Sequence, residues 1–361
     1  MIKRLVVLIT ALGLTLLPIT GAAQAQGTTQ ARAAAPSDTA PPPLTDGYGL
    51  TQVGTATGTA MNFVITVTTP QVAGRHHIKI ILPSDYNADP DKRYPVLYFL
   101  HGAGDDPVNQ NYPALFKSKS MITVVPDGGL RGWHADWRDQ NTAAGAQNWE
   151  TFHINQVIPF IDANLRTIAA KKGRAVAGVS MGGFGAFHYG QDHPELFSQV
   201  ASFSGDIDLS VDSMDLRLAV VASLTNAAGA LCGNIFGNCN GPYGPTVSSD
   251  ALFGSPYPVF NADWKWNQID PSRHMDKLKG IGISIYVGNG NGNPLEAEFW
   301  LEGASKHVRD NLNALGMPYY FADYGNGSKW GPKCNGGHNG YCWAQGLEDF
   351  IPRLEQAFAS S

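Results

Sequence analysis

One stretch, residues 174–191, constrains the possible folds more than any other part of the chain. An apolar run, Ala175–Ala177, leads into Gly178-Val179-Ser180-Met181-Gly182, and a helical pattern of small and apolar residues, Met181–Gln191, follows. A serine in a G-x-S-x-G turn between a buried strand and a helix has a strained backbone, and the flanking glycines let the two backbones pass closely. The pattern therefore predicts a strand–turn–helix unit that exposes Ser180 at the end of a sheet, beside the amides of a helix N-terminus.

The rest of the chain from about residue 48 alternates short apolar runs with amphipathic stretches. The expected strands are Met61–Thr68, His77–Leu82, Val96–Leu100, Ile122–Val125, Ala175–Ala177, Gln199–Phe203, Ile281–Val287 and Tyr319–Ala322. The expected helices are Phe152–Ile168, Met181–Gln191, Pro294–Leu315 and Gly346–Ala359. Strands that are apolar throughout, with helices between them, predict an α/β fold with a mostly parallel central sheet covered on both faces. The irregular segment 211–280 is interpreted as an insertion over the end of the sheet where such folds bind ligands.

Composition excludes several classes of protein. The chain has 361 residues, of which 43% are hydrophobic and 15% charged, so it can bury a core and is not a disordered protein. Its formal net charge is −5 and it has no basic cluster, which argues against nucleic acid or anionic membrane as a partner.

The N-terminus has the features of a secretory leader. A short basic segment is followed by an apolar run, Leu5–Thr20, and by the small-x-small site Ala23-Gln24-Ala25. A membrane anchor is the alternative, but this run is shorter than the roughly 20 residues that a span needs. We therefore expect a signal peptide over 1–25 with cleavage near Ala25, secretion, and no membrane span in the mature form. Residues 26–47, rich in Ala, Pro and Thr, are expected to be a disordered linker, and 48–361 the catalytic domain.

The four cysteines fit an exported protein. Cys232 and Cys239 lie close together in the sequence, as do Cys334 and Cys342. Four cysteines allow three pairings, of which the two local ones, Cys232–Cys239 and Cys334–Cys342, are the simplest. Metal binding is the competing interpretation, but no CxxC or HExxH spacing occurs, so no metal is expected.

A serine nucleophile in this setting needs a general base, and the base follows the serine in the chain order of such folds. The histidines after Ser180 include His193, His274, His307 and His338. His193 precedes a proline just after a helix, and His307 falls within a helix. His338 lies after the last expected strand, in a glycine-rich loop that a Cys334–Cys342 disulfide would hold in place. We therefore expect His338 to be the base.

The acidic partner is harder to place. No carboxylate directly follows the expected strand Ile281–Val287; the next ones lie on the helix that Pro294 opens. Glu302 falls on nearly the same helical face as Leu295 and Phe299, and a carboxylate on an apolar face needs a partner such as an imidazolium. Glu298 lies near that face too and is the fallback, while a surface salt bridge is the alternative role for Glu302.

Stabilisation of an oxyanion would require two backbone amides. One donor is expected to be Met181, the residue after the serine, and the other is expected in the loop after the early buried strand Val96–Leu100, which begins His101-Gly102-Ala103-Gly104. An ordinary glycine turn is the alternative for this loop, and His101 itself is expected to be a loop residue rather than the base.

Together these residues resemble a family, the esterase D group of putative esterases among the α/β-hydrolases, and within it the antigen 85 mycolyltransferases. The similarity runs from about Tyr94 to Phe350. The matching motifs are Asp136-Trp137, Trp149–Phe152, Gly178–Met181, Asn267, Asp270-Pro271, Tyr286–Gly290, Phe299–Glu302 and His338. The resemblance implies an α/β-hydrolase fold, Glu302 as the acid of a Ser-His-Glu triad, and Ala103 and Met181 as the oxyanion donors.

The sequence also departs from the mycolyltransferases. Those enzymes hold a sugar with an aspartate and an arginine where this chain has His101 and Gly104, and the His101-Gly102-x-Gly104 segment looks more like the hydrolytic members. His101 is therefore a candidate substrate-binding residue, as are Trp264 and Trp266 of the insertion. The two tryptophans could instead anchor the insertion to the sheet.

The leading hypothesis is a secreted serine esterase that forms an acyl-enzyme and acts on a small-molecule, polysaccharide-linked or lipid-linked ester. The alternatives are an acyltransferase with the same triad, which moves the acyl group to a sugar or lipid hydroxyl, and a non-catalytic secreted binding module. No cofactor is expected, because neither a dinucleotide-binding nor a P-loop spacing is present.

Overall fold

The computed structural model describes residues 40–225 and 243–361. The chain divides into two units, Met1–Asp38 and Thr39–Ser361, and the described residues all belong to the second. The expected signal peptide, most of the expected linker and the expected Cys232–Cys239 disulfide therefore lie outside the described residues, and they stay predictions.

Within the described residues the chain forms one mixed sheet of ten strands. The strand order is β1-β3-β4-β6-β5-β7-β8-β9-β10, with β2 paired to β3. The strands β5 to β10 are parallel to one another, whereas β1 to β4 form an antiparallel edge, in which β4 pairs antiparallel with β6. The bounds are β1 Thr51–Gln52, β2 Thr57–Gly58, β3 Asn62–Thr68, β4 His76–Ile81, β5 Val96–Leu100, β6 Ile122–Pro126, β7 Arg174–Val179, β8 Gln199–Phe203, β9 Gly282–Val287 and β10 Tyr320–Asp323.

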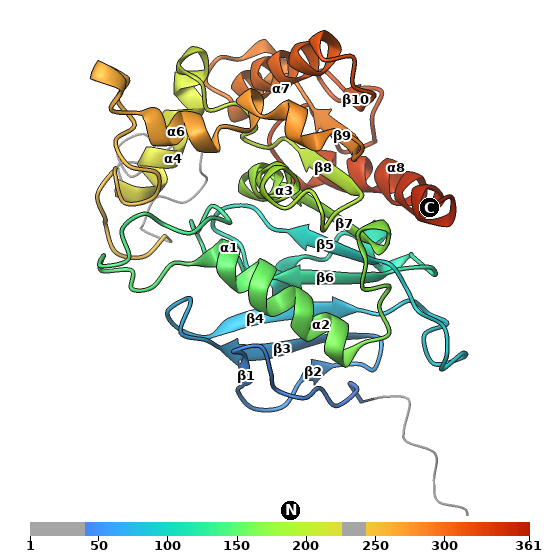
Figure 1. Ribbon diagram of the computed structural model, residues 1–361. Coiled ribbons are helices and arrows are strands. Elements are labelled where there is room, and N and C mark those ends of the chain that lie inside the picture. The colour runs from blue at the N-terminus through green and yellow to red at the C-terminus, as the bar shows by residue number, and fades with distance from the viewer. Residues whose placement is uncertain (1–39, 226–242) are drawn as a thin grey trace, which may run out of the picture. The chain divides into compact units, whose positions relative to one another are not determined.

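Helices cover both faces of this sheet, as the apolar strands predicted (Figure 1). The α-helices are α1 Trp149–Thr151, α2 Ile158–Asn164, α3 Met181–Asp192, α4 Met214–Thr225, α6 Trp264–Ile269, α7 Ala297–Ala314 and α8 Gly340–Ala359; a π-helical segment, η3 Phe152–Val157, joins α1 to α2. The short 3-10 helices are η1 Pro107–Asn109, η2 Pro113–Phe116, η4 Lys171–Gly173, η5 Val211–Ser213, η6 Val259–Asn261, η7 Pro271–Arg273, η8 Met275–Leu278 and η9 Gly290–Gly292.

The core consists of two apolar layers, one on each face of the sheet. Alternate residues of β5 enter different layers: Val96 and Tyr98 pack with α1–α2, α3 and α7, whereas Leu97 and Phe99 pack with α8. All five residues of β5 are buried. This double coverage explains why the central strands are continuous apolar runs without alternation.

The expected strands and helices are present, with shifts at their ends. The largest shift is in the last helix, α8, which begins at Gly340 rather than Gly346. The Asn339 side chain accepts hydrogen bonds from the amides of Tyr341 and Cys342, so it caps the helix inside a segment that the sequence analysis assigned to a loop.

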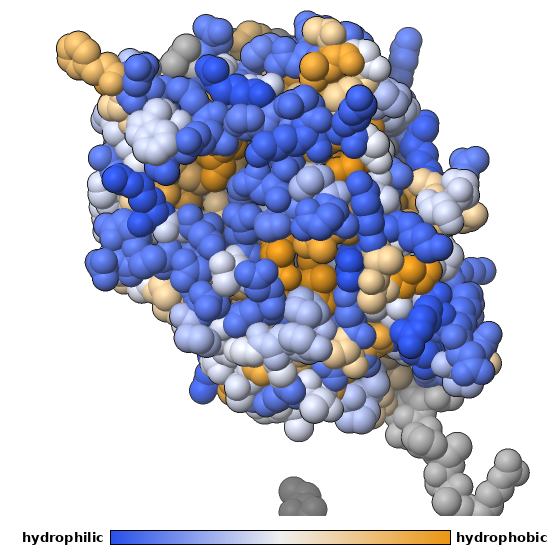
Figure 2. Space-filling view, viewed as in Figure 1, coloured by the Kyte–Doolittle hydropathy of each residue, from blue (hydrophilic) through white to orange (hydrophobic). Residues whose placement is uncertain are grey.

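The face shown in Figure 2 is largely hydrophilic, with small separate hydrophobic patches. Among the described residues, none of the helices combines the length and the apolar character that crossing a membrane requires.

Candidate active site

Ser180 lies at the sharp turn between β7 and α3. Its backbone has φ 53° and ψ −124°, an unusual conformation for a residue with a side chain. The neighbouring glycines are required by space: a Cβ on Gly178 would lie 2.3 Å from the Gly182 carbonyl oxygen, and one on Gly182 would lie 2.1 Å from that of Leu100. The sequence predicted this turn, and the structure has it.

His338 meets Ser180 from a loop near the C-terminus. Its Nε2 lies 2.9 Å from Ser180 Oγ, and the imidazole packs edge-on against Trp343 with ring centroids 4.9 Å apart. The expected Cys334–Cys342 disulfide is present and encloses this loop, tying it to the first turn of α8. The disulfide thus restrains the backbone of the His338 loop, and the Trp343 ring packs against the imidazole.

The carboxylate at His338 belongs to Glu298. His338 Nδ1 lies 2.9 Å from Glu298 Oε2, and because a carboxylate only accepts, Nδ1 carries the proton and Nε2 is free to accept from Ser180. The other oxygen, Oε1, accepts from Ser204 Oγ at 2.6 Å, the Gly288 amide at 2.7 Å and Tyr324 Oη at 3.1 Å. Glu298 is fully buried, and this set of donors compensates for burying its charge.

Glu302, which the sequence analysis favoured as the acid, is not brought to His338. It lies one turn further along α7, and its side chain forms an ion pair with Lys306, Oε1 to Nζ 2.7 Å. This is the surface salt bridge that the sequence left open as the alternative. The reason is positional: Glu298 lies in the first turn of α7 and accepts from the Gly288 amide just past β9, whereas Glu302 lines a separate pocket with Asn289 and Asp323.

The loop expected to supply an oxyanion donor, His101–Gly104, follows β5 and approaches Ser180 from the side opposite β8; it is called the oxyanion loop below. A Cβ on Gly102 would lie 3.4 Å from Ser180 Cβ, which shows how close the loop comes. Within the described residues the amides of Ala103 and Met181 have no hydrogen-bond acceptor in the protein, and Ala103 lines the same cavity as Ser180. Both amides are therefore available to a negative oxygen beside Ser180.

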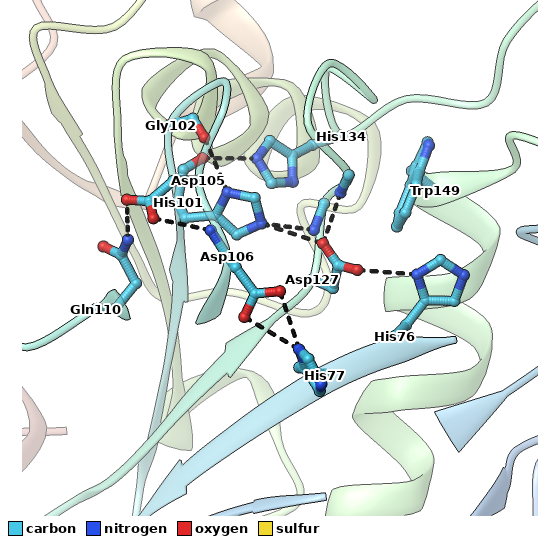
Figure 3. Close-up of polar contacts among 12 residues, drawn as sticks. His76, His77, His101, Gly102, Asp105, Asp106, Gln110, Asp127, His134 and Trp149 are labelled. Atoms are coloured by element: carbon cyan, nitrogen blue, oxygen red, sulfur yellow. Dashed lines mark hydrogen bonds and ion pairs between the residues drawn. The ribbon is translucent and has the colours of Figure 1, made fainter. Parts of the chain in front are cut away.

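His101 is not among the residues that line the cavity beside Ser180. Figure 3 shows its side chain directed toward Asp127. It is fully buried, and its Nδ1 donates to the Gly102 carbonyl at 2.9 Å. Its Nε2 accepts from the Gly128 amide at 2.8 Å, with Asp127 Oδ1 3.4 Å away. The expectation that His101 binds substrate is wrong, because the side chain turns into the core, whereas its expected role as a loop residue agrees with these contacts.

The contacts of His101 fix the peptide that joins Gly102 to Ala103. In a trans peptide the carbonyl and the amide point in opposite directions. The hydrogen bond that fixes the Gly102 carbonyl therefore also fixes the direction of the Ala103 N–H. His134 Nε2 adds a second contact, to the His101 carbonyl at 3.1 Å. Burial opposes a charge on His101, but the nearby carboxylate of Asp127 raises the pKa of the imidazole.

Asp127 joins His101 to a second buried histidine, His76, whose Nδ1 lies 2.9 Å from Asp127 Oδ2 (Figure 3). Burial alone would raise the pKa of Asp127, but His101 and His76 hold it well below the usual range. The carboxylate is therefore ionised and serves as a fixed anchor under the loop.

Ser180 and His338 open into a cavity of about 320 Å³, within the usual size range of small-molecule sites. Its lining residues are Gly102, Ala103, Asp105, Trp133, Val179, Ser180, Asp206, Leu216, Ala219, Ser223, Tyr243, Ala297, Trp300, Leu301, His338 and Trp343. Leu216, Ala219, Ser223 and Tyr243 come from the segment 211–280, as expected for an insertion over the active-site end.

The tryptophans of the cavity differ from those that the sequence suggested. Trp133, Trp300 and Trp343 line it, whereas Trp264 and Trp266 do not. Trp264 is half-exposed on α6, and Trp266 is fully buried, with its Nε1 donating to the Gly254 carbonyl at 2.9 Å. Anchoring of the insertion, the alternative interpretation, thus fits Trp266.

Asp206 is a cavity residue that the sequence analysis missed. It follows β8 by three positions, and β8 lies next to β7, the strand that carries Ser180. A carboxylate just after the strand adjacent to the serine strand was the signal that could have found it. Burial raises the pKa of Asp206 to about 7; the charge of His338 lowers it and that of Glu298 raises it.

A second group of ionisable side chains lies outside the cavity, between α1 and α3. Glu150 accepts from His188 Nε2 at 2.8 Å and from His193 Nε2 at 2.7 Å. Glu150, His188 and Asp192 are close enough to hold a metal ion together. Both oxygens of Glu150 already accept from imidazoles, so these contacts link α1 to α3 and need no metal ion to explain them.

Comparison with known proteins identifies the family. Residues 69–354 match the family model described as putative esterase, which is most of the chain. The chain belongs to the putative esterase family. The resemblance recognised in the sequence is thereby confirmed.

Two curated relatives illustrate this esterase family. Esterase Rv1288 of Mycobacterium tuberculosis is 38% identical over 172 residues, which is 46% of this chain but only 37% of that protein. The chain thus spans little more than a third of the length of this relative. The diacylglycerol acyltransferase/mycolyltransferase Ag85B of Mycolicibacterium smegmatis is 29% identical over 280 residues, 72% of this chain and 76% of the relative.

Solved structures of low sequence identity share the fold. The MPT51 structure from Mycobacterium tuberculosis aligns with a TM-score of 0.58 at 18% identity, covering 81% of this chain and 97% of that one. The serine hydrolase FphF of Staphylococcus aureus aligns with a TM-score of 0.57 at 16% identity, covering 84% of this chain and 99% of that one. The expected α/β-hydrolase fold is confirmed.

Proposed function

We propose that this protein is a secreted serine carboxylic-ester hydrolase that acts through Ser180, His338 and Glu298. The observation that carries the proposal is the pair of 2.9 Å contacts that link Ser180 Oγ to His338 Nε2 and His338 Nδ1 to Glu298 Oε2. Three side chains linked by hydrogen bonds in this way activate the serine, which is a weak nucleophile on its own. Membership of an esterase family and an adjoining cavity support the same assignment.

In the first half of the reaction, Ser180 Oγ attacks the ester carbonyl carbon while His338 Nε2 takes the hydroxyl proton. The carbonyl electrons move onto oxygen, and the amides of Ala103 and Met181 donate hydrogen bonds to that oxygen. When the carbon–oxygen bond to the alcohol breaks, His338 returns the proton to the leaving alkoxide. Glu298 stays ionised and stabilises the imidazolium throughout.

In the second half, water takes the place of the alcohol. His338 removes a proton from the water as its oxygen attacks the acyl-enzyme, and the proton then passes to Ser180 as the carboxylic acid leaves. The products are one acid and one alcohol, and the enzyme returns to its starting state.

Secretion belongs to the same proposal, with residues 48–361 as the catalytic domain. It rests on the leader pattern of residues 1–25 and on a disulfide, Cys334–Cys342, that encloses the catalytic histidine. A structural disulfide at this position is suited to an oxidising compartment.

The second candidate is an acyltransferase that uses the same residues. It is favoured by the similarity to a diacylglycerol acyltransferase/mycolyltransferase over 72% of this chain. In that reaction a sugar or lipid hydroxyl replaces water in the second half. Addition of glycerol or trehalose to the assay distinguishes the two: hydrolysis predicts free acid as the main product, and transfer predicts an acylated polyol.

The test of the proposed function is hydrolysis of p-nitrophenyl butyrate by the wild type and by Ser180→Ala. We expect Ser180→Ala to lower kcat by at least about 10³-fold. Ser328→Ala, a change at an exposed loop serine away from the cavity, is the matched control and should leave kcat unchanged. Equal activity of Ser180→Ala and the wild type would contradict the proposal.

A further inference from the structure

Two buried carboxyl groups lie at the site of His338, and they differ in their partners. Glu298 is satisfied by donors at both oxygens. Asp206 is 6% exposed and lines the cavity beside Ser180, yet its carboxyl has no hydrogen bond to another described residue. Its own backbone amide is the one hydrogen-bond donor that acts on this carboxyl among the described residues. A buried carboxyl with so few partners that lines a cavity indicates a position for a ligand group, because buried polar groups in proteins are almost always fully paired.

The local chain is built to hold Asp206 there. Gly205 packs against the start of α3: a Cβ on it would lie 2.7 Å from Gly183 Cα and 2.3 Å from Ser202 Oγ. This contact joins the end of β8 to the first turn after Ser180. The contact therefore fixes the backbone at the residue before Asp206, and Asp206 lines the same cavity as Ser180.

The order of the strands shows which part of a substrate Asp206 would meet. At the carboxyl edge of the sheet the oxyanion loop follows β5, Ser180 follows β7, Asp206 follows β8 and the loop leading to Glu298 follows β9. Asp206 thus lies on the side of Ser180 away from the oxyanion donors and toward the triad carboxylate. His338 must reach the leaving or incoming alcohol from that side to exchange a proton with it.

The charges of His338 and Asp206 limit which kind of substrate group can bind beside them. His338 becomes an imidazolium during the reaction, so a substrate cation beside it is disfavoured by repulsion, and a substrate anion is disfavoured by Asp206. A neutral hydroxyl can donate to the Asp206 carboxylate or accept from the protonated acid. The indole rings of Trp133, Trp300 and Trp343 supply apolar walls for the carbon skeleton.

We propose that Asp206 binds a free hydroxyl on the alcohol part of the substrate, so that the preferred esters are those of neutral polyols or sugars. This inference rests on the proposed function, and it applies equally whether the polyol leaves in hydrolysis or enters in acyl transfer. It assigns to Asp206 a specificity role that is separate from the Ser180–His338–Glu298 chemistry.

The test compares two esters with the same acyl group and the same three-carbon alcohol skeleton, 1-monobutyrin and propyl butyrate, which differ in the two free hydroxyls. We expect the wild type to favour monobutyrin. Asp206→Ala should lower kcat/KM for monobutyrin by about 10- to 100-fold and for propyl butyrate by less than about 3-fold. Asp206→Asn keeps a hydrogen-bonding side chain and should retain part of the preference.

Asp105→Asn is the matched control, because Asp105 also lines the cavity but its carboxylate already accepts from Gln110 Nε2. We expect it to change kcat/KM for the two esters in equal proportion. Thermal melting of each variant monitors folding.

The inference is overturned if the wild type does not distinguish the esters, or if Asp206→Ala lowers both equally, which would mean that Asp206 acts only through His338. In those outcomes hydrolysis still depends on Ser180 and the proposed function stands. Turnover that persists in Ser180→Ala, or the absence of any turnover in the wild type, would instead remove both proposals.

Discussion

Glu298 and Glu302 occupy the same helix, one turn apart, but their surroundings give them different roles. Glu298 is fully buried and accepts from His338, whereas Glu302 is partly exposed and pairs with Lys306. An exposed i,i+4 ion pair contributes little to stability, about 0.3–0.5 kcal/mol. A buried carboxylate that orients the catalytic imidazole instead affects the rate of the reaction, and its loss lowers kcat by orders of magnitude.

This contrast predicts the outcome of a pair of isosteric changes. Glu298→Gln should lower kcat by about 10³- to 10⁴-fold, because an amide cannot stabilise the imidazolium and can favour the wrong tautomer. Glu302→Gln should change kcat by less than about 2-fold. Steady-state kinetics with p-nitrophenyl butyrate measures both, and a reversed order would return the acid to Glu302.

Burial of the Asp206 carboxyl should make the stability of the folded protein depend on pH. Burial raises the pKa of Asp206 to about 7 in the folded protein, from the 3.8 of an unperturbed aspartate, and His338 and Glu298 are the titratable groups that act on it. The folded state therefore binds more protons than the unfolded state between these values. Its stability should decline as the pH rises from about 4 to about 7 and should carry the full cost above pH 7, up to about 4 kcal/mol.

Asp206→Asn removes the titrating group and with it this cost. We expect the variant to melt at a higher temperature than the wild type at pH 8, and at about the same temperature near pH 4. Melting curves at both pH values provide the test. A variant that gains no stability at pH 8, or gains as much at pH 4, would contradict the raised pKa of the buried Asp206 carboxyl.

At the scale of elements, the conformation of the loop after β5 depends on three side chains beneath it, His101, His134 and Asp127, which together are called the platform. His101 and His134 hold two successive carbonyls of the loop, those of His101 and Gly102, and Asp127 anchors His101 from below. The amide that this platform aims, that of Ala103, would otherwise belong to a glycine-rich segment with wide conformational freedom. Precision at the candidate oxyanion site thus comes from side chains outside the cavity.

His101→Ala should therefore lower kcat with little change in KM. We expect a loss of about 10- to 100-fold, somewhat less than removal of an oxyanion donor, because the Ala103 amide remains but is less well aligned. His77→Ala, which removes a half-exposed histidine paired with Asp106, is the control from the same region. A change in KM alone, with kcat preserved, would argue against an orienting role.

The sequence predicted elements well and the pairing of side chains less well. The strand–turn–helix unit at Ser180, the strand Val96–Leu100 and the position of His338 follow from patterns within a few residues of each other. The choice between Glu298 and Glu302 did not, because both lie near the apolar face of α7 and only the contact with the end of β9 separates them. Asp206 was missed for the same reason, since its importance comes from the neighbouring strand.

At the scale of the whole molecule, the disulfide connects global stability with the site. Cys334–Cys342 links the His338 loop to the start of α8, the helix that covers one face of the sheet. A closed loop of this length stabilises the folded state by about 2–3 kcal/mol through the entropy of the unfolded chain. Loss of the bridge should also free the loop that carries His338.

The double variant Cys334→Ser/Cys342→Ser should therefore melt several degrees below the wild type and have a lower kcat. Its activity should recover in part at lower temperature, where the loop is more often in place. Differential scanning calorimetry and kinetics at two temperatures measure both effects. An unchanged kcat in the folded variant would show that Trp343 and Glu298 alone hold His338.

If Ser180 is the nucleophile of a Ser180–His338–Glu298 triad, a serine-reactive inhibitor should form its covalent adduct on Ser180. The wild-type protein is treated with a fluorophosphonate and digested, and the modified peptide is identified by mass spectrometry. We expect one adduct, on Ser180, formed rapidly by the wild type, much more slowly by Glu298→Gln, and not at all by Ser180→Ala. An adduct on another residue, or none on the folded wild-type protein, would contradict this assignment.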